Sequence, residues 1–162
     1  MKAKTHFELD TWRLCDKIRA LVVAATAPPN VAQHRRFCDQ ICGAAEDAAS
    51  DVAEGFARFK PREFAHFLDY AISSIREVHE RTRHGHGRRF FSNDTAAEII
   101  RYCARAEKAA RSLRSYLWSV RDDDVPYAPN SRPLRPAGRR WDRTVRRRTA
   151  RKPRSTPRKE PS

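Results

Sequence analysis

The sequence predicts an all-α fold, an antiparallel up-down-up-down four-helix bundle followed by a disordered basic tail. Apolar residues recur every three or four positions in four long segments, which is the spacing of one helix face. Short breaks separate these segments, and no strand pattern competes with them before residue 121. Long amphipathic helices with short connections are typical of a bundle. We therefore expect a bundle domain at residues 1–121 and a tail at residues 122–162.

The first predicted helix spans about Asp10–Ala27, and Asp10 or Thr11 is expected to cap its first amides. Pro28 and Pro29 end this helix, because proline lacks the amide hydrogen that a continuing helix needs. Its longest apolar run, Ala20–Ala27, is too short to span a bilayer. The apolar face of the helix is formed by Leu14, Ile18, Leu21 and Ala25.

The second predicted helix runs from Val31 or Gln33 to Phe59 and is unusually rich in alanine, so other helices can pack close to it. Pro61 suits the first turn of a third helix, where its missing amide hydrogen costs nothing. The third helix should end near Arg83, because the following residues 84–87 alternate His with Gly, a helix-breaking pattern. Its apolar line is Phe64, Leu68, Ala71, Ile75 and Val78.

Residues 88–93 are expected to form a loop with Phe90 and Phe91 packed beneath it. Asn93, Asp94 or Thr95 should cap a fourth helix. The apolar positions of this helix repeat strictly at four and three residues, which predicts a near-parallel packing seam of coiled-coil type. These positions are Ile99, Cys103, Ala106, Ala110, Leu113, Leu117 and Val120.

A charged stripe in the second helix is expected to have a structural role. Asp51, Glu54 and Arg58 follow one another at spacings of three and four, so they share one helix face. Charges beside a core seam are costly unless they are paired, and we therefore expect a fixed network. Gly55 costs a helix about 1 kcal/mol relative to alanine, so we expect it to let another helix approach closely.

The sequence does not favour an enzyme, a cofactor or a metal site. A di-metal bundle needs a Glu-x-x-His motif on each of two helices, and only Glu63 with His66 fits. His34, Cys38 and Cys42 share a helix face, but structural zinc takes four ligands, so ordinary reduced core thiols are the better interpretation. There is no glycine-rich phosphate loop, and no serine or cysteine has a base at matching spacing.

The charge distribution favours a polyanionic partner, usually nucleic acid. The formal net charge is +14, and from Arg132 to Lys159 there are 13 Lys and Arg residues against one acid, Asp142. Trp141 is the one aromatic residue among these arginines and is a candidate for base stacking. The other candidate tail contacts are Arg139, Arg140, Arg143, Arg146, Arg147, Arg148 and Arg151. On the fourth helix the candidates are Arg101, Arg105, Lys108 and Arg111, with Arg114 in the same rows; a merely solvated face is the alternative.

Several motifs resemble those of the 23S rRNA intervening-sequence proteins, also called the four-helix bundle protein family. Residues Phe7–Trp12 resemble the family's F-x-x-L-x-V-W opening, and Gln40 matches a Gln of its second helix. Residues Val52–Arg58 resemble its I-A-E-G-x-x-R signature. The third helix matches two further patterns through Glu63, Phe64, Phe67, Leu68, Ala71, Ser74 and Glu77. The resemblance covers roughly residues 6–120.

The resemblance implies an antiparallel four-helix bundle that assembles as a homopentamer, and RNA is then the expected partner in preference to DNA. The four cysteines fall within helical patterns and no apolar run is long enough to span a bilayer, so we expect reduced thiols and a cytoplasmic protein. The resemblance also implies nucleic-acid binding or, alternatively, a protein-interaction module such as an accessory subunit of a reverse transcriptase. The chain departs from the family where a basic pair is replaced by Cys42-Gly43, and where residues 47–51 bring carboxylates. If the family binds nucleic acid through that basic pair, the binding surface of this protein lies elsewhere. The basic tail is then the expected replacement for the lost pair.

Overall fold

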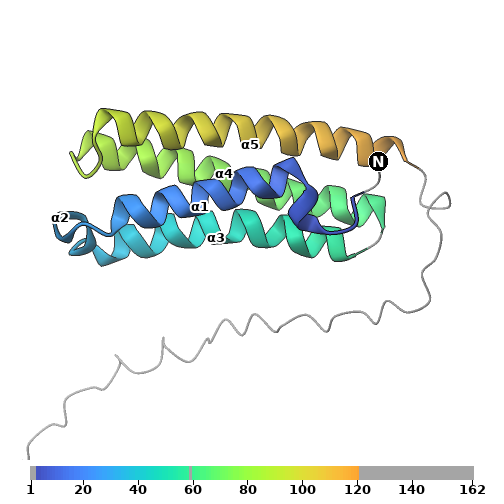
Figure 1. Cartoon of the computed structure of the whole chain (residues 1–162), viewed down its shortest axis with the longest axis horizontal. Helices are drawn as coiled ribbons and strands as arrows, with labels where there is room; N and C mark the ends of the chain where they lie inside the picture. Colours follow the sequence, from blue (N-terminus) through green and yellow to red (C-terminus); the bar gives the residue numbers. More distant parts are fainter. Residues whose placement is uncertain (1–2, 59, 121–162) are drawn as a thin grey trace, which may run out of the picture. The chain divides into compact units, whose positions relative to one another are not determined.

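The computed structural model describes residues 3–58 and 60–120, and all regular elements in this part of the chain are helical. Four long helices lie side by side (Figure 1). This confirms the all-α prediction for the described residues, whereas the predicted tail lies outside them. The elements are a 3-10 helix η1 at His6–Glu8 and helices α1 at Asp10–Thr26, α2 at Pro29–Ala32, α3 at Arg35–Ala57, α4 at Pro61–Gly87 and α5 at Asn93–Ser119.

The long helices enclose one apolar core. Helices α1 and α4 each pack against both α3 and α5, so every long helix has two main neighbours. The apolar stripes of α4 and α5 face inward, as their spacing predicts. On α1 the predicted face is rotated, because Leu14, Leu21 and Ala25 are only partly buried and the buried line is Thr11, Cys15, Ile18, Val22 and Thr26. Each fully buried large aliphatic side chain stabilises the fold by about 1.5–3 kcal/mol. The largest of these side chains are Ile18, Ile41, Leu68, Ile75 and Ile99.

The second long helix begins later than predicted, at Arg35. Pro29 starts the separate short helix α2, because its fixed backbone angle suits a first helical position. His34 then leaves the helical region, with φ −87° and ψ 57°, and interrupts the helix. Its carbonyl oxygen accepts a 2.9 Å hydrogen bond from the amide of Phe37, in the first turn of α3.

The predicted end of the third long helix near Arg83 is wrong, because α4 continues to Gly87. Gly85 is buried, and the helix continues through it. The helix ends in a Schellman motif, in which the amide of Phe90 donates to the carbonyl of Gly85 at 2.8 Å. The amide of Arg89 donates to the carbonyl of His86 at 2.9 Å, and Arg89 has φ 61°.

Two helix caps also differ from the predictions. Ser92, one residue before the predicted candidates, caps α5, and its Oγ accepts a 3.1 Å hydrogen bond from the amide of Thr95. Leu9 precedes α1 and provides no side-chain cap, whereas Asp10 lies in the first turn, where a carboxylate favours the helix dipole. The loop before α5 buries Phe91, as predicted.

Candidate nucleic-acid interface

Three cations surround Tyr102 on the face shared by α1 and α5. The side-chain nitrogen of Lys17 lies 5.8 Å from the Tyr102 ring centroid. The guanidinium carbons of Arg101 and Arg105 lie 5.6 Å and 5.3 Å from it. Tyr102 is partly buried against the core, which fixes its ring, and none of the three cations forms an ion pair within the described residues. We call Lys17, Arg101, Tyr102 and Arg105 the Tyr102 cluster.

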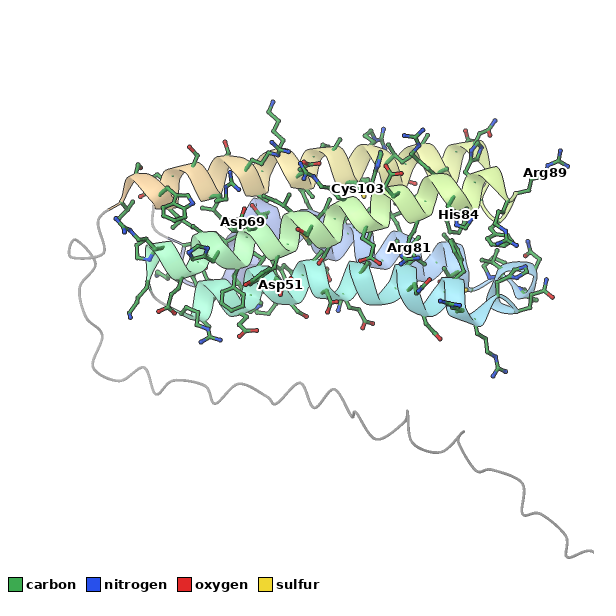
Figure 2. The ribbon with its side chains drawn as sticks, turned by 180° about the vertical axis from the view of Figure 1, so that it is seen from behind. Asp51, Asp69, Arg81, His84, Arg89 and Cys103 are labelled. Atoms are coloured by element: carbon green, nitrogen blue, oxygen red, sulfur yellow. The ribbon has the colours of Figure 1, made fainter. Side chains whose placement is uncertain are left out.

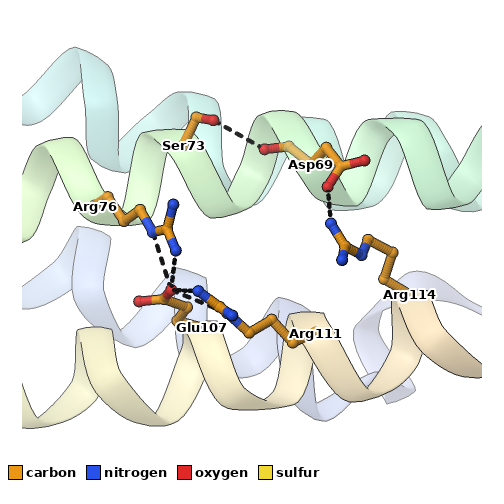
Figure 3. Close-up of polar contacts among 6 residues, drawn as sticks. All are labelled: Asp69, Ser73, Arg76, Glu107, Arg111 and Arg114. Atoms are coloured by element: carbon orange, nitrogen blue, oxygen red, sulfur yellow. Dashed lines mark hydrogen bonds and ion pairs between the residues drawn. The ribbon is translucent and has the colours of Figure 1, made fainter.

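The other arginines of the predicted α5 rows bind carboxylates (Figure 3). Nη2 of Arg111 lies 2.7 Å from Oε1 of Glu107, which also binds Nη2 of Arg76 on α4 at 2.9 Å. Arg114 pairs with Asp69 of α4. The basic rows therefore fall into two groups. Arg111 pairs within α5 and Arg114 pairs with α4. Arg101 and Arg105 form no ion pair within the described residues.

Glu107 lies at the centre of this α4–α5 network. Burial raises the pKa of its carboxyl, but hydrogen bonds from Arg111 and Arg76 outweigh burial, so its pKa falls below the ordinary value. Lys108 follows it in a shallow depression along α5 and is exposed, with no ion pair among the described residues. Lys108 thus remains, with the Tyr102 cluster, among the cations that a phosphate can reach.

The signature stripe on α3 contacts α4. Glu54 pairs with Arg58, whose guanidinium carbon lies 5.0 Å from the ring centroid of Phe67. Asp51 is 6% exposed and lies on the same helix (Figure 2). Gly55 is also buried, against the side of α4 that carries Phe67. Arg58 and Gly55 therefore contact α4, while Glu54 pairs with Arg58 within α3.

Of the remaining motif residues, Glu77 belongs to a polar link between α3 and α4. Oε1 of Glu77 accepts hydrogen bonds from Arg81, with Nη2 at 2.7 Å. Nη1 of the same arginine donates to Oε1 of Gln40 on α3 at 2.8 Å. Ser74 instead donates from its Oγ to the carbonyl of Tyr70, one turn earlier in α4. Glu77 and Gln40, which both match the family pattern, are thus joined through one guanidinium.

The buried thiols are poor nucleophiles and poor metal ligands. Burial raises the pKa of Cys15 to about 12, and the charge of nearby Cys103 adds to this effect. Burial likewise raises the pKa of Cys103 to about 12. Because thiolates, not thiols, attack carbon and bind metals, both groups are inert near neutral pH. Within residues 3–58 and 60–120, no three His, Cys, Asp or Glu side chains gather as a metal site.

Sequence reasoning missed a cationic pocket at one end of the bundle. A cavity of about 510 Å³ lies between the start of α3, the end of α4 and the following loop. No run of basic residues signalled it, since its cations come from segments far apart in the chain. The only local signal is Arg35-Arg36, beside the first turn of α3. Its arginines are Arg35, Arg36, Arg81 and Arg88.

The predicted tail contacts, from Arg139 to Arg151 with Trp141, lie outside the described residues.

The helical bundle and its cationic faces define a class, the small all-helical proteins with a basic surface. A family model described as 23S rRNA-intervening sequence protein matches residues 7–112, so the chain belongs to this family. A search of curated proteins finds no match. No helix in the described part of the chain is long and apolar enough to cross a membrane.

Proposed function

We propose that this protein is a non-enzymatic, antiparallel up-down-up-down four-helix bundle that binds nucleic acid in the cytoplasm, RNA in preference to DNA. The observation that carries the proposal is the Tyr102 cluster, three cations around one aromatic ring that form no ion pair within residues 3–58 and 60–120. Lys and Arg neutralise backbone phosphates, and an aromatic side chain between them is a platform for a base. The family's name, which refers to 23S rRNA, supports RNA.

The cluster is tested by removing its arginines and measuring the salt dependence of binding to single-stranded RNA. Each lost phosphate contact should reduce the log–log salt slope by about 0.7, so Arg101→Gln with Arg105→Gln should reduce it by about 1.4. Arg76→Gln is the matched control, because Arg76 is exposed on α4 and already pairs with Glu107. Equal slopes for the double variant and the control would argue against the cluster as an RNA surface.

A second candidate function is a protein-interaction module, such as an accessory subunit of a reverse transcriptase or another nucleic-acid enzyme. Exposed aromatic side chains favour it: Tyr70 is 60%, Tyr116 63% and Trp118 46% exposed. Such residues are enriched in protein interfaces, and they equally support a homo-oligomer, proposed here as a pentamer by family resemblance. Salt-sensitive RNA binding by the purified protein alone would favour the first candidate. Binding only in the presence of a partner enzyme would favour the second.

A further inference from the structure

The cationic cavity, here called the end pocket, is built from three segments. One side is formed by the start of α3 and the residue before it, another by Arg81 and His84 from the last turns of α4, and a third by Arg88 with Phe90 from the loop. The residues at the start of α3 are His34, Arg35, Arg36, Phe37 and Gln40. In Figure 2, Arg81, His84 and Arg89 lie toward this same end of the bundle. Its volume of about 510 Å³ falls within the range of small-molecule sites, roughly 300–1,000 Å³.

The end pocket carries an uncompensated positive charge. Among the described residues, four arginines line it and no carboxylate residue does. Arg81 pairs with Glu77 on its own helix. Arg35, Arg36 and Arg88 form no ion pair within the described residues. A concave surface lined by one sign of charge concentrates counter-ions, so an anion is the ligand that this pocket suits.

Aromatic packing and hydrogen bonds hold the pocket in shape. The ring of His34 stacks on Phe90, with centroids 4.3 Å apart and an interplanar angle of 25°. Phe37 meets the same ring edge-on at 5.1 Å, and the guanidinium carbon of Arg88 lies 5.2 Å from its centroid. Gln40 and Glu77 fix the guanidinium of Arg81 from two sides. Arg81, which is already held, therefore loses little side-chain entropy when a ligand binds.

We propose that the end pocket binds the terminal phosphate or polyphosphate of a nucleotide, and is a site separate from the Tyr102 cluster. Arginine is suited to phosphate because its planar fork donates two parallel hydrogen bonds. A terminal phosphate monoester carries about −1.5 to −2 charges at pH 7, more than an internal phosphodiester, and so matches several converging arginines better. The nucleotide is either the 5′ end of a nucleic-acid strand or free in solution, and the pocket does not depend on the RNA function proposed above.

The test compares three probes on the full chain: pyrophosphate, ATP, and one RNA oligonucleotide with either a 5′-monophosphate or a 5′-hydroxyl end. Binding is measured by calorimetry and by competition against the labelled oligonucleotide. Pyrophosphate should bind, and the 5′-phosphorylated strand should bind roughly tenfold more tightly than the 5′-hydroxyl strand, the effect of about one charged hydrogen bond. A preference for ATP with no 5′-end effect would support the same site with a free nucleotide as ligand.

Variants locate the site and separate the two proposals. Arg36→Gln and Arg88→Gln should each weaken pyrophosphate binding several-fold and reduce the 5′-end preference. Arg83→Gln is the control, because Arg83 is exposed on α4 and does not line the pocket. Arg101→Gln with Arg105→Gln should weaken both strands equally and leave pyrophosphate binding unchanged. If no phosphate probe binds, or if Arg83→Gln acts like Arg88→Gln, the end pocket is not a phosphate site, whatever the outcome for RNA.

Discussion

Gly85 of α4 packs directly against the ring of Phe37 on α3. A Cβ atom added to Gly85 would lie 2.8 Å from Cζ of Phe37, so no larger side chain fits at position 85. The same atom would lie 2.8 Å from Cε2 of Phe91. The glycine therefore lets two aromatic rings pack onto the helix, and α4 continues through it. The rings that it admits also support the wall of the end pocket, to which Phe37 belongs.

Gly85→Ala should lower the free energy of unfolding by about 1–3 kcal/mol, as overpacking of a core does, despite the better helix propensity of alanine. Gly87→Ala is the matched control, since a Cβ there would meet nothing within 4 Å. That variant should be neutral or stabilising by up to about 1 kcal/mol. Urea unfolding of both variants measures the difference. Two variants of equal stability would show that the rings move aside freely.

Gly55 makes the corresponding contact at the other end of the α3–α4 pair. A Cβ there would lie 2.5 Å from Cδ2 of Phe64 and 2.6 Å from Cβ of Phe67. Gly55→Leu should therefore lower the melting temperature or break the proposed oligomer, whereas Gly43→Ala, with nothing within 4 Å, should do neither. Thermal unfolding and light scattering report the two effects. An unchanged melting temperature and mass for Gly55→Leu would mean that α4 tolerates the displacement.

Arg89 lies in the left-handed backbone region with φ 61°, at the position where a Schellman motif usually has glycine. A non-glycine residue loses about 1–2 kcal/mol there, so Arg89→Gly should stabilise the protein by about 1 kcal/mol. Arg88→Gly is the comparison: Arg88 has φ −88° and packs over Phe90, so its loss should not stabilise. Chemical denaturation distinguishes them, and an Arg89→Gly variant no more stable than the parent would contradict the assignment of strain.

Glu107 should make stability depend on pH in the acid range. Its pKa in the folded protein lies below its ordinary value of 4.5, so its contribution is present above that value and is lost as pH falls through the folded pKa. At pH 7, Glu107→Gln should cost about 0.5–1 kcal/mol. The gap between variant and parent should narrow as pH falls below 4.5 and vanish below the folded pKa. Glu80→Gln is the control, because Glu80 is exposed and, among the described residues, pairs with His79 alone. A gap that persists in acid would indicate lost packing instead.

The sequence predicts a structural feature well when the residues that form it lie close together in the chain, and poorly when they lie far apart. The core register of α5 was predictable, because the burial of Ile99, Cys103 and Ala106 follows from spacing within one helix. The end of α4 was not, since the role of Gly85 depends on rings from two other segments. The same reason explains the sites. Arg101 and Arg105 were identified on their own helix, but Lys17 reaches Tyr102 from α1, and the end pocket gathers arginines that lie far apart in sequence.

The last prediction concerns the C-terminal segment, whose sequence holds 13 Lys and Arg residues between Arg132 and Lys159. If about six of these cations contact phosphates, they contribute roughly −4 to the log–log salt slope for single-stranded RNA. Truncation after Asp124 should therefore flatten the slope and weaken binding. Helix content and oligomer size should not change, because the apolar core described above lies before residue 121.

Trp141 supplies a second readout for the same segment. If it stacks on a base, its fluorescence should fall on addition of RNA, and Trp141→Ala should weaken binding by about 1–3 kcal/mol without altering the salt slope. Trp118→Ala is a control for fluorescence, because Trp118 is half-exposed on α5, away from the arginine-rich segment in sequence. Should the truncated protein bind RNA as tightly as the full chain and with the same salt slope, the segment is dispensable. The Tyr102 cluster and Lys108 then carry the contacts to internal phosphates, and the loss caused by Arg101→Gln with Arg105→Gln should be the same in both proteins.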